Sequence, residues 1–270
     1  LTRARNKAQV NFCNIDNYRP HTGYIYSYDF KEQFYIGSTK DLKKRKQEHK
    51  DGKKAGDTKL KKAISEGLIV RSDLFVTTKV FPGNERWGQD QKKYQNVIDS
   101  FNKSLERLEL SYIDLYLIHS AHADNTRLEQ WNALLDLKND KHITFAGVAN
   151  WNIKHLQELL DEGLPLPDTN QIELHPWAQQ PELVSFLRKN HIHIIAYSSL
   201  VPLSTWRKKD GENSLKTKEL ENQAKSERSL FKKLSIKYDV KESQLLLQWA
   251  IQQNYAVLPK TIKVPRLKEN

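Results

Sequence analysis

The sequence predicts an α/β fold, namely an incomplete TIM-type (β/α)8 barrel of about six βα units, preceded by a small α+β module with a hairpin and a helix. From residue 63 onward, six apolar strand-like runs alternate with amphipathic helical stretches. Strands that alternate with helices indicate right-handed βαβ units, and six in a row favour a barrel. A doubly wound open sheet would show the same periodicity and is the alternative.

The predicted strands are rich in Val, Ile, Leu and Tyr and do not alternate strictly between apolar and polar residues. This composition is typical of strands that are buried on both faces, as in a parallel sheet. The six runs are Leu74–Val80, Ile113–His119, Thr144–Trp151, Asn170–His175, Ile192–Ser198 and Ala256–Lys260.

Amphipathic helices are predicted between these strands. The first places Val97, Phe101 and Leu105 on one stripe, and the third is followed by Gly163 and Pro165, a typical helix stop. The predicted helices are Tyr94–Leu108, Leu128–Leu137, Ile153–Leu160, Val184–Leu187 and Leu245–Ile251.

The first 62 residues have a different pattern. Short aromatic strands at Gly23–Tyr28 and Gln33–Ile36 flank a polar turn at Asp29–Glu32, which predicts a hairpin, and Asp41–His49 follows as a basic helix. We therefore divide the chain into a module of residues 1–62, with a disordered N-terminal tail, and a partial barrel of residues 63–270.

Charge divides the chain at the same point. Residues 1–62 hold 16 Lys and Arg against 7 Asp and Glu, whereas the remaining residues hold 28 against 26, within a net charge of +11. So dense a basic arm predicts a polyanionic partner, nucleic acid first. A solvated helix face with a floppy tail would have the same composition and is the alternative.

Composition also bears on the membrane and on the redox compartment. No run approaches the roughly 18 consecutive apolar residues of a membrane span, and no signal peptide opens the chain, so we expect no membrane partner. The single cysteine, Cys13, cannot form an internal disulfide, which favours a reducing compartment and a cytoplasmic location. The sequence lacks methionine and stops after a strand-and-loop pattern, so we expect a fragment or an incomplete gene model.

Polar or titratable residues stand at the carboxyl end of every predicted barrel strand. In a (β/α)8 barrel these ends form the active-site rim, so the pattern predicts one there. The residues are Lys79, His119, Asn150, Glu173 with His175, Tyr197 with Ser198, and Lys260.

Six segments in order resemble the aldo/keto reductase family over about three quarters of the chain: LFVTTKV, SLERLELSYIDLYLIHS, GVANW, NQIELHP, AYSSL and LPKTIKVPRLKEN. The resemblance implies hydride transfer from NADPH to an aldehyde or ketone. The family uses a tyrosine acid, a lysine, an aspartate and a histidine, and Lys79 and His119 match the lysine and the histidine. Nothing upstream of Lys79 matches the motif of the aspartate and tyrosine. We therefore expect the first two βα units to be missing and reduction to be impaired.

The same resemblance implies a cofactor site. Asn150 and Gln171 match the residues that hold the nicotinamide carboxamide, although Ala149 stands where serine is usual, and Tyr197 matches the aromatic residue that stacks on the ring. The remaining matches are Ser198 and Leu200 for the pyrophosphate, Lys260, Thr261 and Arg266 for the 2′-phosphate, and Glu269 and Asn270 for adenine. Lysine and arginine beside a hydroxyl suit a phosphate dianion, which favours NADPH over NADH.

The N-terminal segments GYIY, YIGST and DLKKRKQEH resemble the GIY-YIG nuclease module. The resemblance implies a Mg²⁺-dependent DNA endonuclease site at Tyr26, Tyr35, Arg45 and His49. Cross-strand packing would explain the two tyrosines equally well. The glutamate that binds metal in this family has no sure counterpart, so we assign no metal ligand. A reductase is the first hypothesis, an endonuclease the second, and a non-catalytic fusion or misassembled fragment the third.

Overall fold

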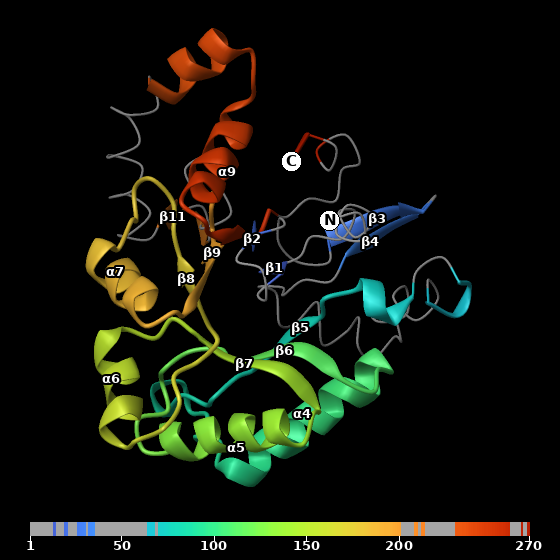
Figure 1. Cartoon of the computed structure of the whole chain (residues 1–270), viewed down its shortest axis with the longest axis vertical. Coiled ribbons are helices and arrows are strands. Elements are labelled where there is room, and N and C mark those ends of the chain that lie inside the picture. Colours follow the sequence, from blue (N-terminus) through green and yellow to red (C-terminus); the bar gives the residue numbers. More distant parts are fainter. Residues whose placement is uncertain are drawn as a thin grey trace.

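The computed structural model describes residues 64–67, 70–200, 230–259, 266 and 269–270 in full, together with the backbone of residues 13–14, 19–20, 26–30, 32–35, 208–209 and 212–213. One sheet of six parallel strands dominates the described part (Figure 1). Its strands are β5 (Thr77–Val80), β6 (Ile113–Ile118), β7 (Ile143–Ala149), β8 (Thr169–Glu173), β9 (His193–Tyr197) and β12 (Ala256–Val257).

The order of the strands identifies the architecture. It is β12-β9-β8-β7-β6-β5, so each described strand of this sheet pairs in parallel with the strand that precedes or follows it along the chain. A doubly wound sheet instead reverses its order at a switch point, which places helices on both faces. The described sheet has no reversal, and its helices lie on the outer side (Figure 1). The predicted partial α/β barrel is confirmed, and the doubly wound alternative is wrong.

The helices agree with the apolar periodicity. The long helix α4 (Tyr94–Leu108) has the predicted bounds, and α6 (Ile153–Asp161) is followed by Gly163 at a φ of +66°, which is the predicted stop. Helix α7 begins three residues before Val184 because Pro181 occupies its first turn. The helices are α4 (Tyr94–Leu108), α5 (Arg127–Asn139), α6 (Ile153–Asp161), α7 (Pro181–Lys189) and α9 (Glu242–Gln252), with 3-10 turns η2 (Arg71–Asp73) and η3 (Glu85–Trp87).

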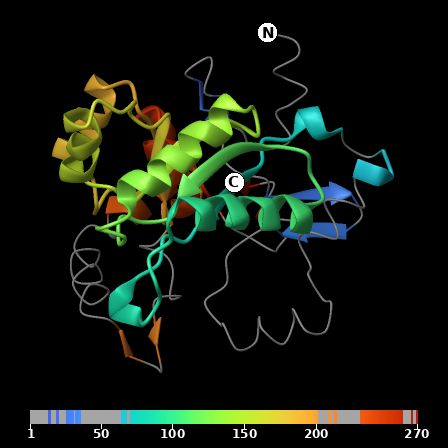
Figure 2. The same cartoon turned by 90° about the horizontal axis from the view of Figure 1, so that it is seen from below.

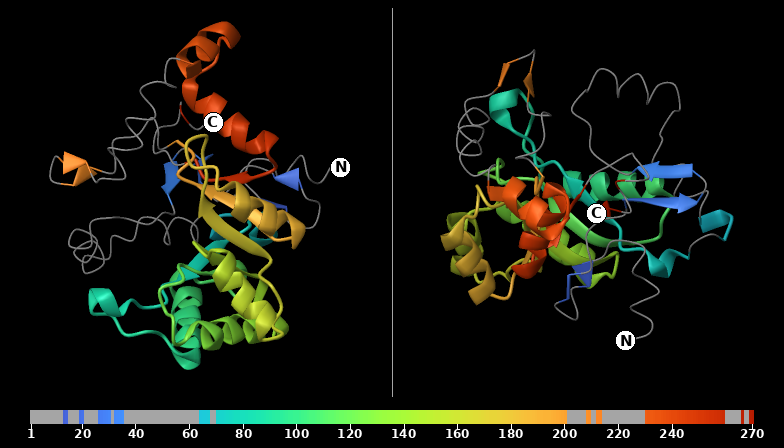
Figure 3. Two further views of the ribbon diagram at one scale, coloured as in Figure 1. Left: turned by 90° about the vertical axis from the view of Figure 1, so that its left-hand side faces the viewer. Right: turned by 90° about the horizontal axis from the view of Figure 1, so that it is seen from above.

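The arrangement of the helices follows the sheet. Helices α4 and α5 lie side by side against it (Figure 2). A further helix over residues 230–238, which the sequence reading missed, stands with α9 beside the β9–β12 end of the sheet (red in Figure 3). Within the described residues, no helix combines the length and the apolar character that a bilayer crossing requires.

The strands are shorter than predicted, mostly at their carboxyl ends. Asn150 and Ser198 follow β7 and β9 directly, and both adopt a left-handed backbone with φ of 60°. This conformation turns the chain out of the extended path, so the strand ends there. In the sequence, each apolar run continues past these positions, so hydrophobicity alone does not show where β7 and β9 end.

Alternate residues of each strand face opposite sides of the sheet. On β6, Tyr116 and Ile118 pack among the helices, whereas Leu115 and Leu117 belong to a second, inner cluster with Ile195. The largest fully buried side chains of the outer core are Trp131, Trp151, Tyr116 and Phe101. The inner cluster is extended by the partly buried Phe75, Phe145 and Leu258.

The same set of aspartate contacts occurs twice at the amino ends of neighbouring strands. Asp114 donates its backbone N–H to Val76 and accepts a bond from the N–H of Val76 at 2.7 Å. Asp168 makes the same reciprocal pair with Ala146, at 2.8 Å. Each carboxylate also forms an ion pair. Arg71 lies 2.6 Å from Asp114, and Lys138 of α5 lies 2.7 Å from Asp168. Burial raises the pKa of Asp114, and the contacts with Val76 and Arg71 oppose that rise. These hydrogen bonds and ion pairs fix where neighbouring strands begin.

The N-terminal hairpin is present, with a different turn from the predicted one. Strands β3 (Tyr26–Phe30) and β4 (Glu32–Tyr35) pair antiparallel, and Tyr26 lies opposite Tyr35. Pairing continues through Asp29 and Phe30, so a single residue separates the strands instead of the predicted turn Asp29–Glu32. Two further two-residue pairs are β1 (Cys13–Asn14) with β2 (Arg19–Pro20) and β10 (Lys208–Lys209) with β11 (Glu212–Asn213). The predicted helix Asp41–His49 lies outside the described residues.

Gly147 on β7 supports a prediction for stability. A Cβ atom there would lie 2.5 Å from Leu117 Cδ2 and 2.9 Å from the carbonyl oxygen of Thr169. We expect Gly147→Ala to lower the free energy of unfolding by about 1–3 kcal/mol, because the neighbouring backbone must move. Urea unfolding followed by far-UV circular dichroism measures this. The half-exposed Leu160→Ala on α6 is the control and should change stability by less than about 0.5 kcal/mol. Equal stability of Gly147→Ala and wild type would contradict the packing described.

Candidate active site

A hydrogen bond across the inner face of the sheet forms the centre of the site. Lys79 on β5 donates from Nζ to Gln171 Oε1 on β8 at 2.5 Å. Strands β6 and β7 lie between these two strands, so a flat sheet would separate them by about 14 Å. A lysine and a glutamine meet over such a gap only if the sheet is strongly curved. The bond therefore shows that the side chains on the inner face converge.

Burial lowers the pKa values of both basic side chains in this centre. Burial lowers the pKa of Lys79 to about 8. Burial also lowers the pKa of His119 to about 4, and the nearby positive charge of Lys79 and His122 adds to this effect. At pH 7 the imidazole of His119 is therefore neutral, and it can donate a hydrogen bond without carrying a charge.

Asn150 connects the neighbouring strand ends. Its side chain donates from Nδ2 to the carbonyl oxygen of His119 at 3.2 Å and accepts at Oδ1 from the Tyr197 hydroxyl at 2.8 Å. Its backbone N–H donates to the carbonyl oxygen of Gln171 at 2.9 Å. Asparagine tolerates the left-handed backbone that aims this side chain, since its short polar side chain suits that region. The ends of β6, β7, β8 and β9 are thus joined through one residue.

A pocket of about 310 Å³ opens beside Asn150 and Tyr197. This volume is at the lower end of the range for sites that bind small molecules. Glu173, which is buried at the end of β8, contributes to the wall, lies 3.3 Å from His175 Nε2, and has its carbonyl oxygen bonded to Gln180. The lining residues are Asn150, Trp151, Asn152, Ile172, Glu173, Ala178, Gln180, Leu183 and Tyr197.

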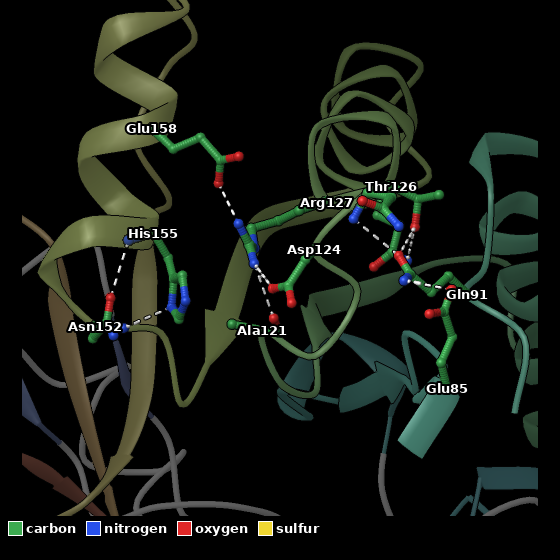
Figure 4. A network of polar contacts seen from close by, with 11 residues as sticks. Glu85, Gln91, Ala121, Asp124, Thr126, Arg127, Asn152, His155 and Glu158 are labelled. Atoms are coloured by element: carbon green, nitrogen blue, oxygen red, sulfur yellow. Dashed lines mark hydrogen bonds and ion pairs between the residues drawn. The ribbon is translucent and has the colours of Figure 1, made fainter. Parts of the chain in front are cut away.

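Two buried polar side chains of α5 hold the loops around the site in place. Arg127 forms ion pairs with Asp124 and Glu158, both at 2.5 Å, and donates to the carbonyl oxygen of Ala121 at 3.1 Å (Figure 4). It therefore ties the loop after β6 to α6. Gln130, which is fully buried, bonds in turn to carbonyl oxygens of the loop after β5. The sequence reading missed both residues, since polar residues in the first turn of a helix usually face solvent.

The structure brings five predicted residues into one network. The network consists of Lys79, His119, Asn150, Gln171 and Tyr197. Ser198 and Leu200 follow on the same loop, at the carboxyl end of β9.

Glu269, which the sequence assigned to adenine, lies at the amino end of α9. Glu269 pairs with Lys241, and its carbonyl oxygen accepts from Gln244 at 2.8 Å. Arg266 is exposed, and its carbonyl oxygen accepts from the N–H of Asn270 at 3.0 Å. Lys260 and Thr261 lie outside the described residues, as do Arg45 and His49 of the predicted nuclease site.

Two properties of the site fit a nicotinamide. The amides of Asn150 and Gln171 supply both donors and acceptors for a carboxamide, and the ring of Tyr197 stands beside the pocket. Among the described residues, no group of three or more His, Cys, Asp or Glu is arranged to hold a metal ion.

Comparison with known proteins agrees with this geometry. The model of the aldo/keto reductase family matches residues 57–270. Glyoxal reductase from Bacillus subtilis (strain 168) is 34% identical over 207 residues, which are 77% of this chain and 65% of that protein. The NAD(P)H-dependent D-xylose reductase of Scheffersomyces stipitis is 32% identical over 236 residues, with coverages of 78% and 70%.

A solved structure of an aldo-keto reductase from Bombyx mori, in complex with NADP, superimposes with a TM-score of 0.65 at 26% identity. The alignment covers 79% of this chain and 67% of that one. The chain spans just under two thirds of the length of the Bacillus relative. On the match to its family model, the order of its strands and the residues at their carboxyl ends, the chain belongs to the aldo/keto reductase family.

Proposed function

We propose that the chain binds NADPH and supports reduction of an aldehyde or ketone at the carboxyl ends of β5 to β9. The observation that carries this proposal is the network from Lys79 through Gln171 and Asn150 to Tyr197, with His119 beside it. Bound NADPH would supply the hydride. The relatives named above are reductases of carbonyl compounds, which supports the substrate class.

The cofactor end of the site follows from the amides. Asn150 and Gln171 hold the carboxamide, and Tyr197 covers the ring. In the structure these groups bond to one another and to Lys79, so binding exchanges protein contacts for cofactor contacts and leaves few buried polar atoms without a partner.

The nucleotide end of the site uses the C-terminal residues. Ser198 and Leu200 border the pyrophosphate, and Lys260, Thr261 and Arg266 bind the 2′-phosphate, so NADPH is preferred over NADH. Glu269 and Asn270 lie toward adenine. A Bombyx mori neighbour whose structure contains NADP supports this choice of cofactor.

The substrate end of the site relies on His119 and Lys79. The neutral imidazole of His119 donates to the carbonyl oxygen and orients it. With its pKa of about 8, Lys79 is mostly protonated at pH 7 and stabilises negative charge that develops on that oxygen. The sequence has no motif for the family's tyrosine acid, and loss of a general acid costs about 10²- to 10⁴-fold in rate. We therefore propose slow turnover.

The organisation of the whole chain is part of the proposal. Residues 63–270 form the reductase part and residues 1–62 a separate basic module, and the start of the family match at residue 57 supports this division. The single cysteine supports a cytoplasmic location.

A nuclease role for the N-terminal module is the second candidate. One backbone feature favours it, because Tyr26 of β3 lies directly opposite Tyr35 of β4. Two tyrosines at one level of a hairpin, together with Arg45 and His49 on the basic segment that follows, could act on one phosphodiester with Mg²⁺.

We predict that NADPH binds saturably and quenches the protein's tryptophan fluorescence. Arg266→Ala should raise the Kd for NADPH about tenfold or more, because a charge-assisted bond to the 2′-phosphate is lost. The Kd for NADH should not change. Arg107→Ala on the exposed face of α4 is the matched control and should bind both nucleotides like wild type. Absence of quenching at millimolar NADPH would disprove the proposed cofactor site.

We predict that the amine of Lys79 titrates near pH 8. Because burial favours the neutral amine, acylation of Lys79 should rise with pH and reach half of its plateau at about pH 8, as measured by peptide mass spectrometry. Gln171→Leu should move that midpoint lower, since the bond to Gln171 stabilises the charged form. NADPH should protect Lys79 from the reagent. A midpoint above about pH 10 would mean that the amine is solvated.

We predict, for the second candidate, that the full chain nicks supercoiled plasmid in the presence of Mg²⁺ and that Arg45→Ala abolishes nicking. The matched control Lys46→Ala removes a neighbouring positive charge and should retain activity. Cleavage lost equally in both variants would indicate unspecific binding of DNA, and no cleavage at any Mg²⁺ concentration would rule the candidate out.

A further inference from the structure

The amine of Lys79 lies beside an apolar cluster on the inner face of the sheet. Lys79 is aligned with Leu117 of β6, and its hydrogen-bond partner Gln171 is aligned with Ile195 of β9. Residues that are aligned on neighbouring strands point to the same face of a sheet. Leu117 and Ile195 belong to the inner cluster, so both ends of the bond between Lys79 and Gln171 stand next to apolar side chains.

The partner of this amine is a neutral amide. Lys79 Nζ donates to Gln171 Oε1 at 2.5 Å, and within the described residues no carboxylate forms an ion pair with Lys79. A buried ammonium ion that lacks an opposite charge loses hydration without compensation, and burial accordingly lowers the pKa of Lys79 to about 8. The neutral amine has a free electron pair and is a nucleophile, whereas the ammonium ion is not.

A second polar group stands next to this amine. The backbone N–H of His119 donates to the carbonyl oxygen of Val80, the residue after Lys79, at 2.9 Å, and the charge of Lys79 contributes to the lowered pKa of His119. A neutral imidazole offers one nitrogen that donates and one that accepts a proton. Lys79 is only partly buried, so a small molecule can reach its amine.

We propose that Lys79 binds small aldehydes covalently, as a reversible imine on its side-chain nitrogen. The nitrogen attacks the carbonyl carbon, and the carbonyl oxygen takes up a proton to give a carbinolamine. The bond between carbon and oxygen then breaks, the oxygen leaves as water with both hydrogens that the nitrogen has lost, and a carbon–nitrogen double bond remains. Nothing is oxidised or reduced, so no cofactor takes part.

This inference rests on the proposed function for one feature, which is the carbonyl oxygen held by His119. It gives Lys79 a role as a nucleophile in addition to the stabilisation of negative charge. Aldehydes are favoured over ketones because their carbonyl carbon is less hindered and more electrophilic.

The test is reductive trapping of the full chain with propanal and sodium cyanoborohydride at pH 7, without nucleotide. The reductant converts an imine to a stable propylamine, and peptide mass spectrometry measures the rate at each lysine. Lys79 should react at least about tenfold faster than the exposed Lys103 of α4, because about a tenth of its amine is neutral at pH 7, against less than about a thousandth for a solvated lysine. The rate at Lys79 should saturate with propanal, and that at Lys103 should rise linearly.

A single substitution tests the part played by the neutral partner. Gln171→Glu places a carboxylate against the amine and holds it in the charged form, so propylation of Lys79 should slow about tenfold or more. Gln252→Glu makes the same change at the exposed end of α9 and should retain the rate of wild type. Far-UV circular dichroism checks the fold of both variants. If Gln171→Glu unfolds, the comparison of Lys79 with Lys103 in wild type decides.

The remaining outcomes separate this inference from the proposed function. Equal rates at Lys79 and Lys103, or an unchanged rate in folded Gln171→Glu, would overturn the covalent site. Saturable binding of NADPH in those cases would leave the proposed function intact. Conversely, fast and saturable propylation of Lys79 in a protein that does not bind NADPH would support the covalent site and refute the proposed function.

Discussion

Curvature of the parallel sheet is the constraint on which the rest of the described structure depends. Lys79 and Gln171 stand three strands apart, and they meet because β6 and β7 bend the inner face toward itself. Consecutive strand order and helices on one side produce that bend, since all crossovers have the same hand. Gly147 keeps the crowded inner face free of one more side chain. Without the bend, the polar strand ends would form a line and not a site.

The two edges of the sheet have different chemistry. At the amino edge, Asp114 and Asp168 complete their contacts with backbone and cations of their own chain. At the carboxyl edge, Gln171 bonds to the side chain of Lys79 and Asn150 bonds to that of Tyr197. The amino edge therefore serves stability, and the carboxyl edge carries the site that we propose for recognition, which is the usual division in a (β/α)8 barrel.

The sequence predicted the parts of this arrangement that depend on local pattern. All six strands and the bounds of α4 followed from apolar runs, and the resemblance to a family supplied the five residues that now form one network. Strand ends were misjudged at Asn150 and Ser198 because a left-handed backbone leaves no trace in hydrophobicity. Arg127 and Gln130 were missed because their burial depends on loops that close over them from other units. Such contacts are tertiary, so no local pattern encodes them.

The strictly sequential pairing of the strands has a consequence for how this architecture changes during evolution. The register between β6 and β7, or between β8 and β9, involves only those two strands and the helix that connects them. A unit at one end can therefore be exchanged for foreign sequence without altering the alignment of the remaining units. The strands that carry the proposed cofactor site can therefore be inherited separately from the other units of such a barrel.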